Sequence, residues 1–415
     1  MRPMLRESPY PMVSVEEAQR IIREHIKPID SEEIDCCTIL SDVPDGRVLA
    51  EDVYASEDIP DLPKAAVDGY ALQSADGINE RRVLAEITAG IDRSQIVESG
   101  EAVRIMTGAP IPQGADTVVM VEDTQEQKGV LHIQRAVQQG QNIHVVGQDV
   151  AQGMLVLAQG TVLGAAEVGL LATIGATRVS VARRPRVAVL STGDEVREPD
   201  VARGAGGIRD SNRYALLAAI REAGCDAISL GIARDDEQTQ REAILHGLEQ
   251  ADILLTSGGV SMGTRDLIKP LLAELGTVHF GRVLFKPGKP TTFATVQEKL
   301  VWGLPGYPVS SLVSFEVFVR PALRRMLGDK HPERASVQVV LRGLIKAAPD
   351  RPEYQRAVVQ WEGGQLVAQN TGAQGSSRLL SLRDANALLL VPPGDRIYQA
   401  GDRLQALLIG SLTPF

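Results

Sequence analysis

The chain has 415 residues, 44% of them hydrophobic, and this length and composition predict two to four domains with ordinary hydrophobic cores. Its formal net charge of −10 argues against a wide basic surface for nucleic acid, so any anion-binding site must be local. The three cysteines, with Cys36 and Cys37 adjacent and Cys225 remote, offer neither a disulfide framework nor zinc-ligand spacing, and we expect thiols in a reducing compartment.

No apolar stretch approaches the length of about 18 residues that would span a bilayer. The N-terminus also lacks a basic segment followed by an apolar core. The sequence therefore predicts a cytoplasmic protein with no membrane partner. Residues 1–11 contain prolines and no periodic pattern, and we expect them to form a loose tail.

The first regular element is a predicted helix that begins after Ser14. Ser14 and Glu17 form a capping-box pattern, and the apolar residues that follow recur at helical spacing. From about residue 58 to about residue 150 the pattern changes to short strands and turns, which is typical of a mainly β domain. The segment 147–180 contains a predicted helix at 165–172 and would return the chain to the first domain, so the β domain would be an insertion.

Two turns in the β domain carry candidate polar residues. Asp68 precedes Gly69 in the otherwise apolar AAVDGYAL, and Thr107 precedes Gly108 in RIMTGAPIPQGAD. Asp-Gly and Thr-Gly pairs are good turn formers, so each position alone is explained by turn chemistry.

From Pro185 the pattern alternates strands with helices. Three segments are predicted to be strands followed by loops: PRVAVLSTGDEV, DAISLGIARDD and ADILLTSGG. The segments between them have helical periodicity. Two further strands and a closing helix with Pro308 in its first turn follow. This alternation predicts an α/β domain with a doubly wound parallel sheet and right-handed crossovers.

The loop TSGGVSMGTRD is the strongest candidate for a ligand-binding turn. It follows a buried strand, contains Gly258, Gly259 and Gly263, and precedes a helix, so backbone N–H groups and a helix start could hold an anion. Ser261 could add a hydroxyl, and Asp266 is either a helix cap or a ligand for a cation. The P-loop and dinucleotide-binding patterns both fail, because Pro290 follows Gly288–Lys289 and STGDEV lacks the glycine triplet.

The loops at the carboxyl ends of parallel strands converge on one rim of the sheet. Each charged residue there could be a solvated loop charge, but acids and lysines together indicate a cation and a phosphorylated ligand. These residues are Asp194, Glu195, Asp235, Asp236, Asp266, Lys286 and Lys289. The alternating pattern after Arg325 predicts a small β barrel or sandwich, with Arg356, Ser376 and Ser377 as its contacts to a ligand.

Taken together, the motifs resemble the molybdopterin molybdenumtransferases, the MoeA family that includes the E domain of gephyrin. The resemblance covers nearly the full length from Val13. It rests on AVDGYAL, RIMTGAPIP, VAVLSTGDEV, DSNRYAL, TSGGVSMGTRD, FKPGKP, GLPGYPVSS and GAQGSS, in that order.

The resemblance implies a MoeA-like chain of four domains: multidomain α/β plus β. An elongated first domain (12–55 and 148–182) is interrupted by the inserted mainly β domain (56–147). The α/β molybdopterin-binding domain (183–330) and a C-terminal β barrel (331–415) follow. It also implies a homodimer whose active cleft lies between the α/β domain of one subunit and the β domain of the other.

The implied reaction inserts molybdenum from molybdate into adenylylated molybdopterin and releases AMP with Mg²⁺. Catalytic positions would be Asp68, Thr107, Glu195, Asp235, Asp266 and Lys286, with Asp266 and Glu195 as metal ligands. Pterin or nucleotide binding would involve Gly258, Gly259, Ser261, Gly263, Asp210, Asn212, Pro305 and Pro308. Molybdate would be held by Lys286, Lys289, Ser310, Arg356, Ser376 and Ser377. The molybdopterin adenylyltransferase is an expected partner.

Two residues depart from the family pattern: Tyr307 stands where the family usually has Asn, and Arg282 where a lysine is common. Two other functions are compatible with such a fold. A dimeric scaffold that binds partners would not need the combined set of acids and lysines. The related adenylyltransferase is essentially the α/β domain alone, so the β insertion and the C-terminal barrel favour the insertase.

Overall fold

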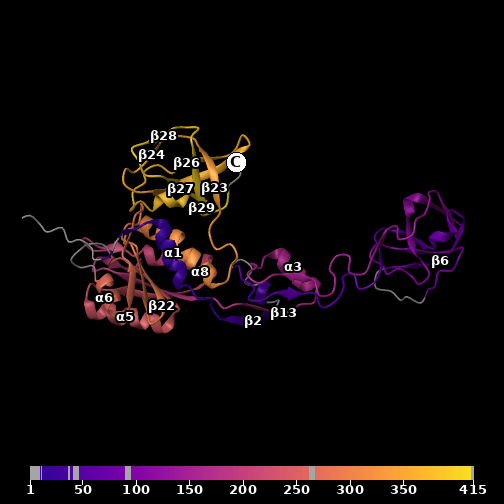
Figure 1. Ribbon diagram of the computed structural model, residues 1–415, viewed down its shortest axis with the longest axis horizontal. Helices are drawn as coiled ribbons and strands as arrows, with labels where there is room; N and C mark the ends of the chain where they lie inside the picture. The colour runs from indigo at the N-terminus through magenta and orange to yellow at the C-terminus, as the bar shows by residue number, and fades with distance from the viewer. Residues whose placement is uncertain are drawn as a thin grey trace, which may run out of the picture. The chain divides into compact units, whose positions relative to one another are not determined.

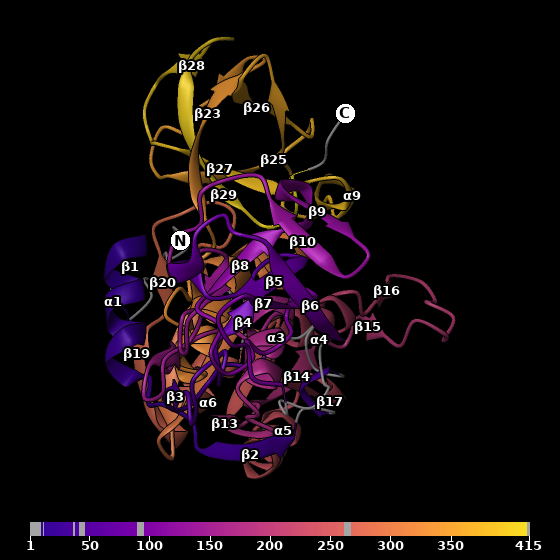
Figure 2. The same cartoon turned by 90° about the vertical axis from the view of Figure 1, so that its right-hand side faces the viewer.

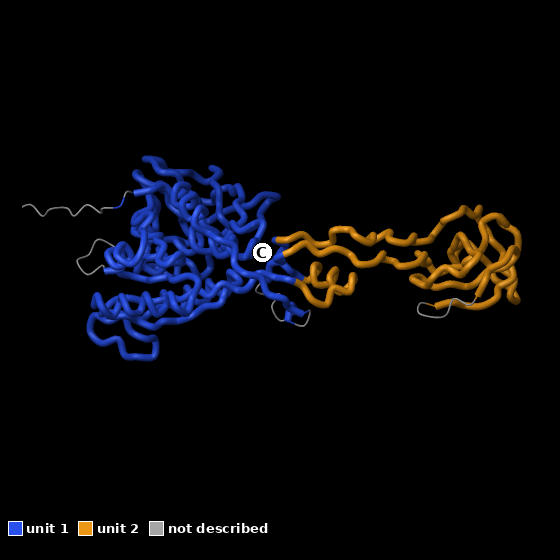
Figure 3. The backbone as a smooth tube through the Cα atoms, turned by 60° about the horizontal axis from the view of Figure 1, so that its bottom comes forward, with its two compact units in different colours: residues 1–50, 160–164, 180–415 blue, residues 51–159, 165–179 orange. Residues whose placement is uncertain are grey.

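The computed structural model describes residues 10, 12–35, 38–40, 46–88, 95–260 and 267–412. The chain forms two compact units, coloured separately in Figure 3: unit 1 is Met1–Ala50, Gly160–Gly164 and Ser180–Phe415, and unit 2 is Glu51–Gln159 and Ala165–Val179. The four domain boundaries expected from the sequence remain a prediction beside this two-unit division.

Unit 1 is organised around a six-stranded sheet with the order β17-β14-β18-β22-β21-β19. Strands β17, β14, β18 and β22 are parallel, as predicted. At one side of the sheet, β21 and β19 run antiparallel, a detail that the predicted parallel sheet did not include. The bounds are β14 Arg186–Thr192, β17 Asp226–Ala233, β18 Ile253–Ser257, β19 Thr277–Phe280, β21 Thr292–Val296 and β22 Lys299–Leu304.

A tight hairpin explains the antiparallel pair. The turn between β21 and β22 is made by Gln297 and Glu298, whose φ angles are 49° and 66°. Two consecutive residues with positive φ make the two-residue turn whose twist suits an antiparallel hairpin. Because neither residue is Gly, Asn or Asp, the sequence carries no turn signal here.

Helices pack on both faces of this sheet (Figure 1). Ser14 Oγ accepts the N–H of Glu17 at 3.1 Å at the start of α1, and Asp236 Oδ1 accepts the N–H of Thr239 at 2.8 Å at the start of α5. None of the helices in the described ranges is long and apolar enough to cross a membrane. The bounds are α1 Val15–His25, α4 Asn212–Glu222, α5 Glu237–Gln250, α6 Ile268–Leu275, α7 Pro308–Ser314, the π-helical η4 Phe315–Val319, α8 Arg320–Met326 and α9 Leu380–Arg383.

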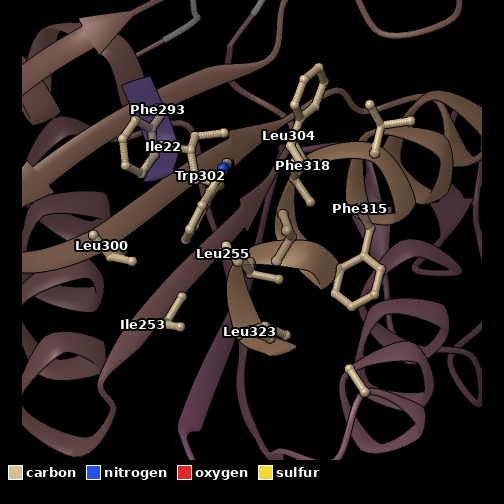
Figure 4. Close-up of a cluster of buried hydrophobic side chains, with 14 of the residues drawn as sticks. Ile22, Ile253, Leu255, Phe293, Leu300, Trp302, Leu304, Phe315, Phe318 and Leu323 are labelled. Atoms are coloured by element: carbon tan, nitrogen blue, oxygen red, sulfur yellow. The ribbon is translucent and has the colours of Figure 1, made fainter. Parts of the chain in front are cut away.

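The hydrophobic core explains why β18 is a continuous apolar run. Ile253 and Leu255 point to one face and pack in a cluster with Trp302 (Figure 4), whereas Leu254 packs in a second cluster with α5 and α6 on the other face. A strand covered on both faces has no polar side to alternate with. Gly258 and Gly259 follow this buried strand directly, at the carboxyl edge of the sheet.

The C-terminal part of unit 1 is a closed barrel with the strand order β23-β26-β25-β27-β29, which confirms the predicted barrel. In Figures 1 and 2 it lies at the opposite end of unit 1 from α5 and α6. The bounds are β23 Ser336–Leu341, β25 Glu353–Glu362, β26 Gln365–Asn370, β27 Ala387–Val391 and β29 Arg403–Leu408. Short strands elsewhere in unit 1 are β1 Met12–Val13, β2 Ser31–Asp35, β15 Val196–Arg197, β16 Ile208–Arg209, β20 Arg282–Val283, β24 Ile345–Lys346 and β28 Ile397–Tyr398.

Unit 2 is mainly β, with a six-stranded sheet in the order β8-β5-β7-β6-β10-β9. Gly69 opens the inner strand β5, and a Cβ on it would lie 2.0 Å from the carbonyl oxygen of Val119, so packing in the sheet requires glycine there. The sheet strands are β5 Gly69–Leu72, β6 Arg81–Ile87, β7 Glu101–Ile105, β8 Thr117–Met120, β9 Thr124–Gln127 and β10 Val130–Ile133. The remaining elements are β3 Val53–Tyr54, β4 Lys64–Ala65, β11 Ile143–His144, β12 Leu155–Leu157 and α3 Ala165–Thr173, with β13 Arg178–Ala182 at the return to unit 1.

Candidate functional site

A pocket of about 570 Å³ lies at the carboxyl edge of the parallel strands. We call it the rim pocket. Its wall comes from the loops after β14, β18 and β22, from the start of α4 and from a turn of the barrel domain. The lining residues used below are Ser191, Glu195, Asp210, Asn212, Asp235, Ser257, Gly258, Gly259, Pro290, Pro305, Gly306, Tyr307, Pro308 and Ser377.

Two glycines bring backbone into this wall. Gly258 and Gly259 have φ angles of 97° and 64°. A Cβ on Gly258 would lie 2.9 Å from both the carbonyl oxygen and Oγ1 of Thr192, and one on Gly259 would lie 2.8 Å from Cγ1 of Ile268. Both the backbone conformation and the close packing therefore require glycine. The predicted Ser261, Gly263 and Asp266 lie outside the described residues.

The Gly258→Ala variant is expected to lose about 2 kcal/mol of unfolding free energy, because it combines a left-handed backbone with a steric overlap. Gly204→Ala is the matched control, since Gly204 also has a positive φ of 67° but no heavy atom within 4 Å of its Cβ position. The Gly204→Ala control should lose less unfolding free energy than Gly258→Ala. Urea unfolding measures both, and equal losses would show that the Thr192 contact does not restrict this loop.

Asn212 holds two sides of the rim pocket together. Its Nδ2 donates to Ser257 Oγ and to the carbonyl oxygen of Gly306, both at 2.8 Å. The nearby Asp210 is buried, and its Oδ1 accepts the N–H of Arg213 at 3.1 Å while its Oδ2 lies 3.2 Å from Arg213 Nε. Asp210 therefore has a structural role at the start of α4 in addition to lining the pocket.

Three residues of the wall have a buried side-chain oxygen with no hydrogen-bond partner in the described part of the chain: Ser191 Oγ, Asn212 Oδ1 and Asp210 Oδ2. Of these, Asp210 Oδ2 lies 3.2 Å from the Arg213 guanidinium, so only the oxygens of the two neutral side chains lack a polar partner among the described residues. Buried polar groups are nearly always satisfied in folded proteins. Because Ser191 and Asn212 line the rim pocket, their unpartnered oxygens are candidate contacts for a polar ligand.

The acidic residues of the rim have different environments. Glu195 is exposed, lines the pocket, and has no hydrogen bond or ion pair to its carboxylate among the described residues. Asp235 also lines the pocket, and it and Asp194 each accept the other's backbone N–H, at 3.4 and 3.2 Å. Asp236 caps α5, and the N–H and hydroxyl of Thr239 lower the pKa of its carboxyl.

The described residues contain no cluster of three or more metal-ligating side chains. Mg²⁺ bound to phosphates commonly takes only one or two carboxylates and completes its shell with phosphate oxygens and water. The accessible Glu195 carboxylate, with Asp235 in the same wall, fits that requirement.

The residues predicted to hold molybdate do not all line one cavity. Ser377 lines the rim pocket, as does Pro290, which follows the exposed Lys289. Lys286 lines a second pocket, at the barrel, together with Lys346, Arg351, Glu353 and Gln374. Ser310 is buried in α7, and Ser376 accepts the N–H of Val309 through its carbonyl oxygen at 3.1 Å.

Arg356 is fully buried in the barrel. Its Nε donates to Ser381 Oγ at 3.0 Å and its Nη2 to the carbonyl oxygen of Gly375 at 3.2 Å, but its Nη1 has no partner among the described residues. Burial lowers the pKa of this guanidinium to about 10. A buried cation with an unused donor is suited to an anion.

Lys286 is fixed by a residue that sequence reasoning missed. Its Nζ lies 3.0 Å from Oε1 of Glu353, a carboxylate that is 3% exposed, and Gln355 Nε2 donates to the other oxygen at 3.1 Å. Glu353 lies within the barrel strand β25, and no motif in the sequence indicates that it pairs with Lys286. Ser191, in contrast, is the next-to-last residue of the apolar strand β14, so its place near the rim could have been inferred from the predicted topology.

In unit 2 the structure brings Asp68 and Thr107 together. Asp68 Oδ1 accepts both the backbone N–H and the hydroxyl of Thr107, each at 2.7 Å. These two bonds lower the pKa of the Asp68 carboxyl, so it stays ionised well below neutral pH. Both residues are exposed.

Known proteins resemble the whole chain. Three family descriptions match successive segments: "MoeA N-terminal region (domain I and II)" over residues 13–175, "Probable molybdopterin binding domain" over 188–325 and "MoeA C-terminal region (domain IV)" over 338–409. A molybdopterin molybdenumtransferase of Bacillus subtilis is 35% identical over 375 residues, covering 88% of this chain and 87% of the relative.

Two further proteins extend the comparison. Gephyrin of Dictyostelium discoideum is 38% identical over 459 residues that cover 98% of this chain, and the chain spans 64% of the length of that gephyrin. The crystal structure of the molybdopterin biosynthesis MoeA protein from Pyrococcus horikoshii OT3 has a TM-score of 0.83 and 30% identity, covering 96% of this chain and 100% of that chain. This similarity confirms the predicted fold class of an α/β domain, a mainly β domain and a C-terminal barrel.

Proposed function

Because the chain belongs to the molybdopterin molybdenumtransferase (MoeA) family, we propose that it inserts molybdenum into adenylylated molybdopterin and releases AMP. The observation that carries this proposal is the rim pocket, a glycine-walled cavity on the segment that matches the molybdopterin-binding description. Its two unpartnered buried polar atoms suit a polar heterocycle, and its glycine backbone suits phosphate oxygens.

In this reaction the protein would act by holding the pterin nucleotide and Mg²⁺ in position. Gly258, Gly259 and Asn212 bind the pterin or its nucleotide, with Asp210 fixing the start of α4. Glu195 and Asp266 would hold Mg²⁺, with Asp235 beside Glu195 in the wall. Bound Mg²⁺ would polarise the phosphoanhydride, and no protein nucleophile is needed.

Molybdate, the second substrate, would be held by basic side chains and serines near Arg356. The barrel turn reaches both pockets, because Gln374 lines the second pocket and Ser377 lines the rim pocket. The segment FKPGKP does the same through Lys286 and Pro290. Lys286, Lys289 and Arg356 supply positive charge, and Ser310, Ser376 and Ser377 supply hydroxyl donors for a tetrahedral dianion.

The proposal includes a cytoplasmic homodimer in which Asp68 and Thr107 of one subunit complete the cleft of its partner, and a contact with the molybdopterin adenylyltransferase for delivery of the pterin. The ionised Asp68, already ordered by Thr107, is the group that the second subunit contributes. A dimeric scaffold is the weaker alternative, since the rim pocket keeps its accessible carboxylate and its unpartnered polar atoms.

The function is tested by incubating the purified chain with adenylylated molybdopterin, Mg²⁺ and molybdate and measuring AMP by chromatography. Wild-type protein should release AMP, and Asp266→Ala should not. Full release by Asp266→Ala would remove Asp266 from the mechanism, and no release by the wild type would contradict the function itself.

Mixing subunits tests the shared cleft. Asp68→Ala and Asp266→Ala homodimers should each be inactive, whereas random reassociation should restore about one quarter of the wild-type sites, one cleft in each mixed dimer. Activity that stays at the level of the separate variants would show that each cleft is built within one subunit.

A further inference from the structure

Tyr307 is an aromatic side chain on the wall of the rim pocket that the chain leaves uncovered. It is 62% exposed, and no hydrogen bond to its hydroxyl group exists within the described residues. A large apolar ring beside a pocket with polar contacts is a common feature of sites that bind flat heterocycles. The residue lies in GLPGYP, where the family usually has Asn in place of Tyr307.

The backbone that carries this ring is held on both sides. The carbonyl oxygen of Tyr307 accepts the N–H of Ser311 at 2.9 Å in the first turn of α7, and the carbonyl oxygen of Gly306 accepts from Asn212 at 2.8 Å. Pro308 follows directly, so φ is fixed at the next position. The backbone that supports the ring is therefore held in place by both neighbours.

Part of the wall next to Tyr307 is glycine backbone. Gly306 precedes it, and a Cβ on Gly306 would lie 3.6 Å from Cα of Gly258, so the two glycine loops are in contact. The same wall holds Ser191 Oγ and Asn212 Oδ1, the buried atoms that have no partner among the described residues. An aromatic ring, a strip of glycine backbone and two free polar atoms together match a planar heterocycle that carries amino groups.

We propose that Tyr307 is the stacking residue for the fused heterocycle of the substrate, and that it sets the affinity for that ring rather than for the phosphates. This inference rests on the proposed function. The heterocycle is either the adenine or the pterin, because both are planar, fused and amino-substituted. Stacking on an aromatic side chain does not depend on a particular hydrogen-bonding pattern of the ligand. Either ring could therefore stack on Tyr307.

The test compares Tyr307→Ser, which removes the ring, with Tyr307→Phe, which keeps it. Calorimetric titrations use three probes: AMP, pterin and ribose 5-phosphate. The serine variant should bind the probe that stacks about tenfold more weakly, and the phenylalanine variant should bind it within about twofold of wild type. Ribose 5-phosphate has no planar ring, so neither variant should change its affinity.

Proton NMR of the bound probe gives a second readout. The heterocycle protons should shift upfield with wild type and Tyr307→Phe, and this shift should disappear with Tyr307→Ser. An effect on AMP alone identifies adenine as the stacked ring, and an effect on pterin alone identifies the pterin. Unchanged binding of both heterocycles by Tyr307→Ser would overturn the inference while leaving AMP release, and hence the proposed function, intact. Equal weakening of ribose 5-phosphate would also overturn it.

Discussion

The Glu195→Gln variant is expected to lower the rate of AMP release by about 100-fold or more at a fixed, subsaturating Mg²⁺ concentration. Glu195 is an exposed carboxylate on the wall of the rim pocket, and its side chain makes no hydrogen bond or ion pair with any described residue. The substitution removes one negative charge and keeps the shape. The loss should therefore come from weaker Mg²⁺ binding, and the stability of the protein should stay unchanged.

A Mg²⁺ titration separates this effect from general damage. In Glu195→Gln the Mg²⁺ concentration that gives half-maximal activity should rise, and activity should partly recover at high Mg²⁺. Asp200→Asn is the matched control, because Asp200 is an exposed carboxylate of the same loop region that does not line the rim pocket. A wild-type Mg²⁺ profile in Glu195→Gln would exclude Glu195 as a ligand.

Molybdate is expected to raise the melting temperature of the wild-type chain, and Arg356→Met is expected to abolish this rise and molybdenum insertion together. Burial lowers the pKa of Arg356 to about 10, below its ordinary value of 12.5. At neutral pH the folded protein therefore carries an unfavourable buried charge, and this cost falls as the pH rises above about 10. A dianion on the free Nη1 offsets the cost, and ligand at about 100 times its Kd stabilises by about 2.7 kcal/mol.

Thermal unfolding with molybdate, at ionic strength matched with chloride, measures this stabilisation. Methionine fills the volume of Arg356 without a charge, so the variant should fold. Arg403→Met provides the control, since Arg403 lies on an exposed face of β29 and its side chain donates to Gln338 Oε1 at 3.1 Å. It should keep the full response to molybdate. A normal response in Arg356→Met would place the dianion elsewhere.

The sequence predicted most elements of the α/β domain because its signals are local. Ser14 and Pro308 mark helix starts where the structure has them, and the buried run Ile253–Leu255 is strand β18. The direction of β21 was missed for a physical reason: its hairpin turn uses Gln297 and Glu298 at positive φ, which propensity does not indicate.

The candidate site was predicted less completely, because side chains from distant segments meet there. Topology alone brings Glu195, Asp235 and Gly258 to one rim, and these residues do line one pocket. Lys286 and Lys289 were expected on the same rim, but Lys286 pairs with the buried Glu353 at the barrel. That contact depends on how the barrel packs against the α/β domain, and no local pattern encodes it.

Tyr307 illustrates the opposite case. From the sequence, Tyr307 is only a departure from the family pattern between Gly306 and Pro308, and nothing predicts where its ring lies. The structure gives it a fixed backbone, an exposed ring and a place on the pocket wall, which are properties that require the loops after β18 and β22 to meet.

The most direct test of the account is the molar ratio of molybdenum retained on the pterin to AMP released. Wild-type protein with adenylylated molybdopterin, Mg²⁺ and molybdate should give one molybdenum, counted by mass spectrometry, for each AMP. Release of AMP without retained molybdenum would contradict an insertase, because it would show that the rim pocket cleaves the nucleotide without using the oxyanion.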